Sequence, residues 1–182
     1  MPMTKEKIQG QKDGLTCPKW RLYANFLHRE LARLWYGKKN IFSLVKGDKE
    51  QEKLWIPFSF IWGAVVSRFG ETHGLTTDEL TKRVESASKE CLKLISCGVG
   101  VGLPFYIPFC FARRTLGDKL ASEFLYDPQI TEIAALAVYA YGYAIEGKTP
   151  QDVKGANLRP IEFYEGLPVA PELEELFYDK PN

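Results

Sequence analysis

Residues Leu94 to Ala112 read LISCGVGVGLPFYIPFCFA, a run of 19 residues without a charged side chain. A helix that spans a membrane needs about 20 apolar residues, so the length alone would suit a lipid bilayer. Five glycines and prolines interrupt the run, and in lipid they would leave backbone groups without hydrogen bonds. We therefore predict a segment buried in protein, with no stable membrane insertion. The interrupting residues are Gly98, Gly100, Gly102, Pro104 and Pro108.

The sequence on either side of this run has the spacing of helices. Thr76 and Glu79 have the spacing of a capping box, and apolar residues then recur every three or four positions up to Leu94. This pattern predicts an amphipathic helix over residues 77–97, which ends where the glycines begin. We expect the chain to cross the core in extended form as far as Pro108 and to form another helix over residues 109–126.

Three further segments complete the predicted fold. Residues 18–37 carry an apolar stripe opposite a basic face, residues 54–66 are apolar on nearly all sides, and residues 128–147 are rich in alanine. We predict a mostly α protein: a bundle of about five helices with a buried Gly/Pro-rich extended segment and an irregular C-terminal arm. Residues 1–15 would form a flexible basic arm, residues 16–148 the helical domain, and residues 149–182 an acidic, proline-containing arm.

The charge of the chain changes sign along its length. Residues 1–53 contain twelve Lys and Arg against six Asp and Glu, residues 54–127 contain eight of each, and residues 128–182 contain four against nine. The front therefore carries +6 and the tail −5, within a total of +1. A gradient of this kind indicates an acidic partner for the front, or contact between the front of one copy and the tail of another.

From this gradient we predict a non-enzymatic assembly subunit of a protein or nucleoprotein complex, which forms homo-oligomers or joins a larger assembly. Its basic first helix and N-terminal arm would contact nucleic acid, and its acidic tail would dock on the basic front of a neighbour. The predicted nucleic-acid contacts are Arg21, Arg29, Arg33, Lys38 and Lys39. The predicted interface residues of the tail are Phe163, Tyr164, Leu176 and Phe177.

Two alternatives stay open at the level of sequence. Residues 74–98 have the cadence of a helix-turn-helix, and residues 104–113 could form a β-hairpin, which together would make an α+β winged-helix DNA-binding regulator. That fold requires a helix break near Ser86. The other alternative is a small-ligand-binding protein or enzyme, with a pocket lined by Trp55, Trp62, Phe105 and Tyr106.

Catalytic and metal-binding patterns are sparse. The two histidines, His28 and His73, are far apart in sequence, and the four cysteines show no CxxC spacing. We therefore expect no cofactor, no metal and no enzymatic activity. The N-terminus has no apolar leader of the secretory kind, so we expect reduced cysteines and a cytoplasmic location.

Overall fold

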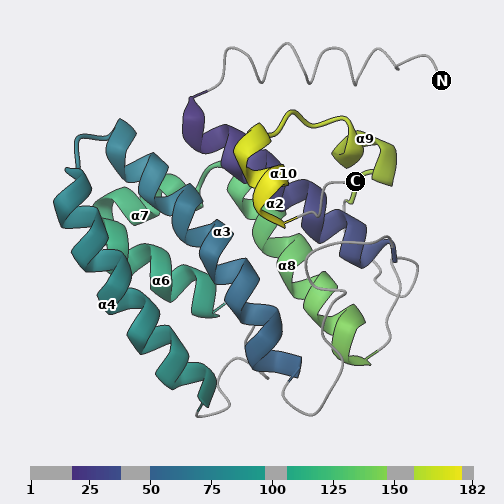
Figure 1. The fold of residues 1–182 in the computed structure, drawn as a ribbon, viewed down its shortest axis with the longest axis horizontal. Coiled ribbons are helices and arrows are strands. Elements are labelled where there is room, and N and C mark those ends of the chain that lie inside the picture. The colour runs from purple at the N-terminus through teal and green to yellow at the C-terminus, as the bar shows by residue number, and fades with distance from the viewer. Residues whose placement is uncertain (1–17, 38–49, 97–105, 147–157, 178–182) are drawn as a thin grey trace.

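The computed structural model describes residues 18–37, 50–96, 106–146 and 158–177 (Figure 1). These residues contain eight helices and no strand, which confirms the prediction of a mostly α bundle. The helices are α2 (Lys19–Trp35), α3 (Glu50–Thr72), α4 (Thr77–Ser96), α6 (Tyr106–Leu116), α7 (Asp118–Leu125), α8 (Pro128–Glu146), α9 (Ile161–Glu165) and α10 (Pro171–Phe177).

Helix α2 is surrounded by other helices. It packs against α3 on one side and α8 on another, and α9 lies against it from the C-terminal part of the chain. Figure 1 shows α10 crossing over α2, so the beginning and the end of the described chain lie side by side. Helices α3, α4, α6 and α7 form the other half of the bundle, with α6 in contact with both α3 and α4.

Aromatic rings join the two halves of the bundle. The ring of Phe69 on α3 lies 5.3 Å from that of Trp20 on α2 and 5.0 Å from that of Phe124 on α7, centroid to centroid. Phe124 also contacts Trp62 at 5.4 Å and is fully buried. Tilted and edge-on ring pairs at these distances add to the gain from burying apolar surface. The core therefore forms from helices that are distant in sequence.

The predicted capping box is present at the start of α4. The backbone N–H of Glu79 donates to the Thr76 hydroxyl at 3.2 Å, and the backbone N–H of Thr76 donates to the Glu79 carboxylate at 3.3 Å. From there α4 is continuous to Ser96, without a break at Ser86. The predicted α+β winged-helix alternative is therefore wrong, since it needs that break and a hairpin where α6 is helical.

Two helix predictions need correction. The segment predicted as one helix over residues 109–126 forms two helices, separated by Gly117, whose φ of +82° suits glycine and strains other residues. Helix α6 also begins at Tyr106, so Pro108, which we expected in an extended segment, lies in the first turn of a helix, where proline is tolerated. Residues 98–105 of that predicted segment lie outside the described residues.

The apolar helix predicted over residues 54–66 is longer in the structure. It begins at Glu50, because the charged residues that precede Leu54 are themselves good helix formers, and it continues to Thr72. Its second half is buried at Ile61, Trp62, Val65 and Val66. Across the four described ranges, no helix is both long enough and apolar enough to cross a bilayer.

Candidate functional site

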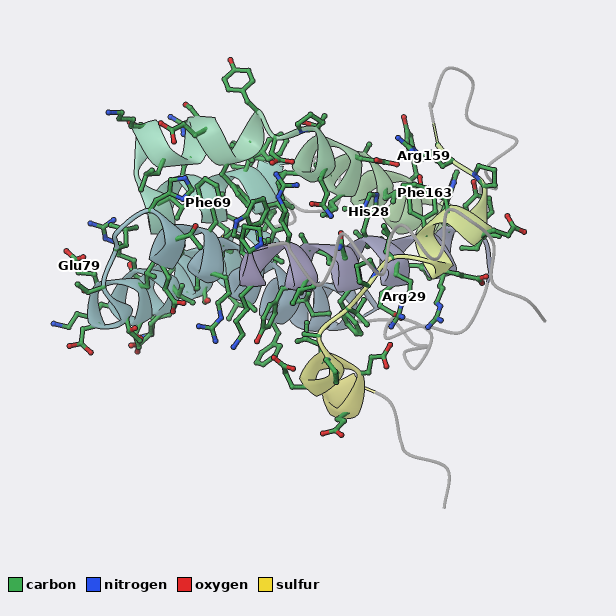
Figure 2. All side chains as sticks on the ribbon, turned by 90° about the horizontal axis from the view of Figure 1, so that it is seen from above. His28, Arg29, Phe69, Glu79, Arg159 and Phe163 are labelled. Carbon is green, nitrogen blue, oxygen red and sulfur yellow. The ribbon has the colours of Figure 1, made fainter. Side chains whose placement is uncertain are left out.

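Much of the polar face of α2 is buried and contacts other parts of the chain. Asn25, His28, Arg29 and Glu30 are each at most 7% exposed, although helical periodicity placed three of them on the face opposite the apolar stripe. Helix α8 and the described part of the C-terminal arm, residues 158–177, cover this face (Figure 2). Polar side chains can be buried in this way when other polar groups pair with them.

The first turns of α2 pair with the start of α8. One guanidinium nitrogen of Arg21 lies 2.5 Å from the Asp127 carboxylate, and another donates to the Gln129 side chain at 3.0 Å. The Gln129 amide in turn donates to the Asn25 side chain. Asp127 also accepts the backbone N–H of Gln129 at 2.9 Å, which caps α8. A single carboxylate therefore starts α8 and fixes α8 to α2.

In the middle of α2, His28 lies in a group with Glu132 and Tyr164; His28 and Tyr164 are buried, and Glu132 is partly exposed. His28 Nε2 lies 3.6 Å from the carboxylate of Glu132 on α8, and the His28 ring lies 4.9 Å from the ring of Tyr164 on α9. The Tyr164 hydroxyl donates to Glu132 at 2.8 Å and accepts the backbone N–H of Arg159 at 3.0 Å. This group joins α2, α8 and the arm at one point.

The electrostatics of this group follow from its burial and its neighbours. Burial raises the pKa of Glu132, but His28, the Tyr164 hydroxyl and the charge of Arg159 together lower it by more, so its pKa lies below the ordinary value. Burial, with the adjacent Glu132 carboxylate, raises the pKa of Tyr164 even though the Arg159 N–H opposes the change. Glu132 is therefore held as a carboxylate and Tyr164 as a neutral donor.

The acidic end of the arm pairs with the basic side of α2. A guanidinium nitrogen of Arg29 lies 2.5 Å from the Glu174 carboxylate, and Tyr23 donates to Glu172 at 3.4 Å. Within α2, Glu30 is fully buried and lies 3.5 Å from Arg29 and 3.2 Å from Arg33. Figure 2 shows Arg29 extending from α2 on the side of the arm. The opposite charges of front and tail thus meet within one chain.

The residues predicted to bind nucleic acid are placed as follows. Arg21, Arg29 and Arg33 lie along α2, and each contacts a carboxylate of the same chain. Lys38 and Lys39 lie outside the described residues. The three arginines therefore contribute to internal pairing in this structure.

Of the four predicted interface residues, two have side chains that the structure describes. Tyr164 is fully buried against α2 and α8, while Phe163 is half-buried and its ring lies 4.1 Å from the guanidinium of Arg159. Leu176 and Phe177 belong to α10, but their side chains lie outside the described residues. Of the predicted aromatic pocket, Trp62 is buried and donates to the Pro108 carbonyl at 3.0 Å, and Trp55 and Phe105 are not described at side-chain level.

Sequence reasoning did not single out Glu132, Asp127 or Glu174 as partners of α2. The available signal was the run His28, Arg29 and Glu30, three ionisable residues in succession on a helix that also carries an apolar stripe. Comparisons with protein-family models, with curated proteins and with solved structures found no match for this chain. In the part of the chain that the structure describes, no three His, Cys, Asp or Glu side chains gather so as to hold a metal ion.

Proposed function

We propose that this chain is a non-enzymatic assembly subunit that self-associates through its acidic C-terminal arm. The observation that carries the proposal is the docking of that arm on α2 and α8 by complementary groups: Arg29 with Glu174, Tyr23 with Glu172, and Tyr164 with Glu132. The front and the tail of the chain form a matched pair of surfaces.

A matched pair of this kind can also form between copies. The arm is a short segment that follows α8 after residues 147–157. It contacts α2 and α8, which both precede these residues in the chain. When such an element is exchanged between protomers, every contact is kept and only the chain that supplies it changes. The contact within one chain is favoured at low concentration, and the contact between chains gains as concentration rises.

Binding rather than catalysis fits the accessibility of the site. His28, beside Glu132 and Tyr164, is the described histidine with acid–base neighbours, and it is 2% exposed. A catalytic base must lie within hydrogen-bond reach of its substrate. The buried group is better suited to fixing the arm than to meeting a substrate.

Contact with nucleic acid remains part of the proposal, with a specific condition attached. A phosphate would have to replace Asp127, Glu30 or Glu174 at the arginines of α2, so nucleic acid and the arm would compete for Arg29. The ratio of absorbance at 260 and 280 nm, measured on purified protein before and after a high-salt wash, tests this part. A ratio typical of protein alone before the wash would count against it.

Self-association is tested by light scattering on the full chain. With protein from about 10 µM to about 1 mM, the wild-type mass should rise from the monomer value of 20.7 kDa toward twice that value. The double variant Glu172→Arg/Glu174→Arg reverses the acidic end of the arm and should stay at the monomer mass. Glu123→Arg, which reverses an exposed charge on α7, is the matched control and should behave as wild type.

Two results would overturn the proposal. One is a wild-type chain that stays monomeric over the whole concentration range. The other is a double variant that assembles as well as wild type, since the arm would then have no part in the contact.

A further inference from the structure

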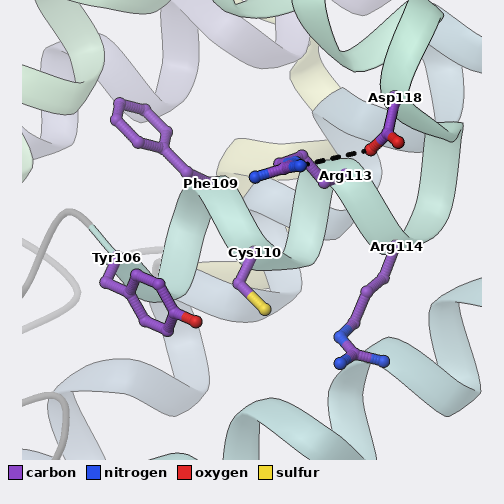
Figure 3. Close-up of a pocket in the computed structure, with 6 residues that line it drawn as sticks. All are labelled: Tyr106, Phe109, Cys110, Arg113, Arg114 and Asp118. Atoms are coloured by element: carbon purple, nitrogen blue, oxygen red, sulfur yellow. Dashed lines mark hydrogen bonds and ion pairs between the residues drawn. The ribbon is translucent and has the colours of Figure 1, made fainter.

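A second site lies at a distance in sequence from α2 and its arm. Helix α6 and the first residue of α7 line an open pocket of about 440 Å³ (Figure 3). A volume of this size falls within the range of small-molecule sites, roughly 300–1,000 Å³. The residues that line it are Tyr106, Phe109, Cys110, Arg113, Arg114 and Asp118.

The pocket has an apolar end and a basic end. Five of its residues recur along α6 at intervals of three and four, so they lie along one broad face of the helix. Tyr106, which is 51% exposed, and Phe109 lie in the first half of α6, and Arg113 and Arg114 lie in its last turn (Figure 3). Figure 3 shows the Phe109 ring and the Arg113 guanidinium on one side of the helix, and the Tyr106 ring, the Cys110 thiol and the Arg114 guanidinium on the other. A ligand on this second side would meet an aromatic ring at one end and a guanidinium group at the other.

The two arginines already hold carboxylates, but at exposed positions. Arg113 lies 3.4 Å from Asp118, with side chains that are 65% and 87% exposed, and Arg114 pairs with Glu90 of α4. An exposed ion pair contributes little to stability, and each guanidinium has five N–H donors. A carboxylate from a ligand can therefore join Arg114, or replace Glu90, at small cost.

We propose that this pocket binds a small organic anion with a flat apolar body, such as an aryl carboxylate. Its ring would lie against Tyr106, and its carboxylate would bind Arg114. Planar guanidinium groups match carboxylates in geometry, and aromatic side chains offer ring contacts. The proposal is independent of assembly through the arm, because the two sites have no residue in common.

The thiol of Cys110 provides a reporter inside the pocket. It is partly exposed and lines the pocket, so a ligand that fills the pocket will cover it. The other described cysteine, Cys91, is buried, and burial together with Cys110 raises the pKa of its thiol to about 12. Cys91 should therefore react slowly with alkylating reagents and serve as an internal check that the protein is folded.

The experiment measures alkylation of Cys110 by iodoacetamide in the full chain, with peptide mapping by mass spectrometry. We expect 2-naphthoate to slow the reaction in a saturable way, whereas the neutral 2-naphthamide should not. Arg114→Gln should weaken the protection by naphthoate about tenfold, as expected when one charge-assisted hydrogen bond is lost. Glu90→Gln should strengthen it, because it removes the carboxylate that pairs with Arg114.

Lys82→Gln, which removes the same charge from an exposed position on α4, is the matched control and should leave protection unchanged. Equal protection by naphthoate and naphthamide would overturn the anion part of the proposal, and so would protection that survives Arg114→Gln. Absence of protection by either compound, with Cys91 still slow to react, would overturn the site itself.

Discussion

The hydroxyl group of Tyr164 connects three parts of the chain through two hydrogen bonds. It donates to Glu132 on α8 and accepts from the backbone of Arg159, while its ring lies against His28 on α2. Each of these groups is costly to bury alone, since an unpaired buried polar group costs about 1–3 kcal/mol. The position of the arm therefore depends on individual polar contacts as well as on apolar burial.

The lowered pKa of Glu132 gives a prediction for the pH dependence of stability. A carboxylate whose pKa is lower in the folded state than its ordinary value stabilises the fold fully above that ordinary value. This stabilisation is lost as the pH falls through the folded-state pKa. Glu132→Gln should therefore lower the free energy of unfolding at pH 7 and lose less of it between pH 5 and pH 3 than wild type does.

Urea unfolding at a series of pH values measures this effect. Glu123→Gln makes the same change at an exposed position of α7 and should keep the wild-type profile, because exposed charges contribute little. If Glu132→Gln and wild type lost the same free energy of unfolding between pH 5 and pH 3, the Glu132 carboxylate would not be a source of the acid sensitivity.

At the scale of single elements, the ends of the helices follow local chemistry. The capping box of α4 satisfies N–H groups that have no partner within the helix, and Gly117 takes a positive φ between α6 and α7. The first of these was visible in the sequence as a pair of residue types at a fixed spacing. The second was missed because apolar residues continue at helical spacing through Gly117, and periodicity alone does not show a break.

The cap of α4 can be tested by Thr76→Ala. The variant removes the hydroxyl that accepts the Glu79 N–H, so the free energy of unfolding should fall by about 1 kcal/mol. Thr81→Ala is the matched control, since the Thr81 hydroxyl only bonds back to the Thr77 carbonyl within the same helix. Its effect should stay within about 0.5 kcal/mol of wild type. Equal losses for the two variants would remove the special role of Thr76.

The candidate site was only partly predictable, because the pattern of one helix does not show what covers its polar face. Periodicity grouped Arg21, Arg29 and Arg33 on a polar side of α2. It could not show that this side faces carboxylates rather than water, because a polar helix face has the same pattern in both surroundings. The partners Asp127 and Glu174 are more than a hundred residues away in sequence.

At the scale of the whole molecule, α2 is held between the bundle and the arm. The bundle side is apolar and aromatic, and the arm side combines ion pairs and the Tyr164 hydrogen bonds with buried apolar residues such as Ala170 and Leu173. A short segment that forms a small part of the core opens more readily than the core it covers. The arm should therefore detach without unfolding of the bundle, which exchange between copies requires.

Amide hydrogen exchange, followed by mass spectrometry, tests this order of stability. We expect the slowest exchange in α2 and faster exchange in α9 and α10. Glu174→Gln removes a charge from the arm contact and should accelerate exchange in α10 while leaving α4 unchanged. Equal protection of α2 and α10 would mean that the arm opens only when the whole protein unfolds, and arm exchange would then be slow.

The sequence by itself determined the helical class of the protein, the start of α4 at its capping box, and the end of α2 just before Gly37. These features depend on contacts between residues a few positions apart, and such contacts leave a spacing in the sequence. Only the tertiary structure decided that the polar face of α2 is buried and that the acidic tail meets the basic front within one chain. Those outcomes depend on which distant segments come together, and the pattern of a single helix carries no record of what covers it.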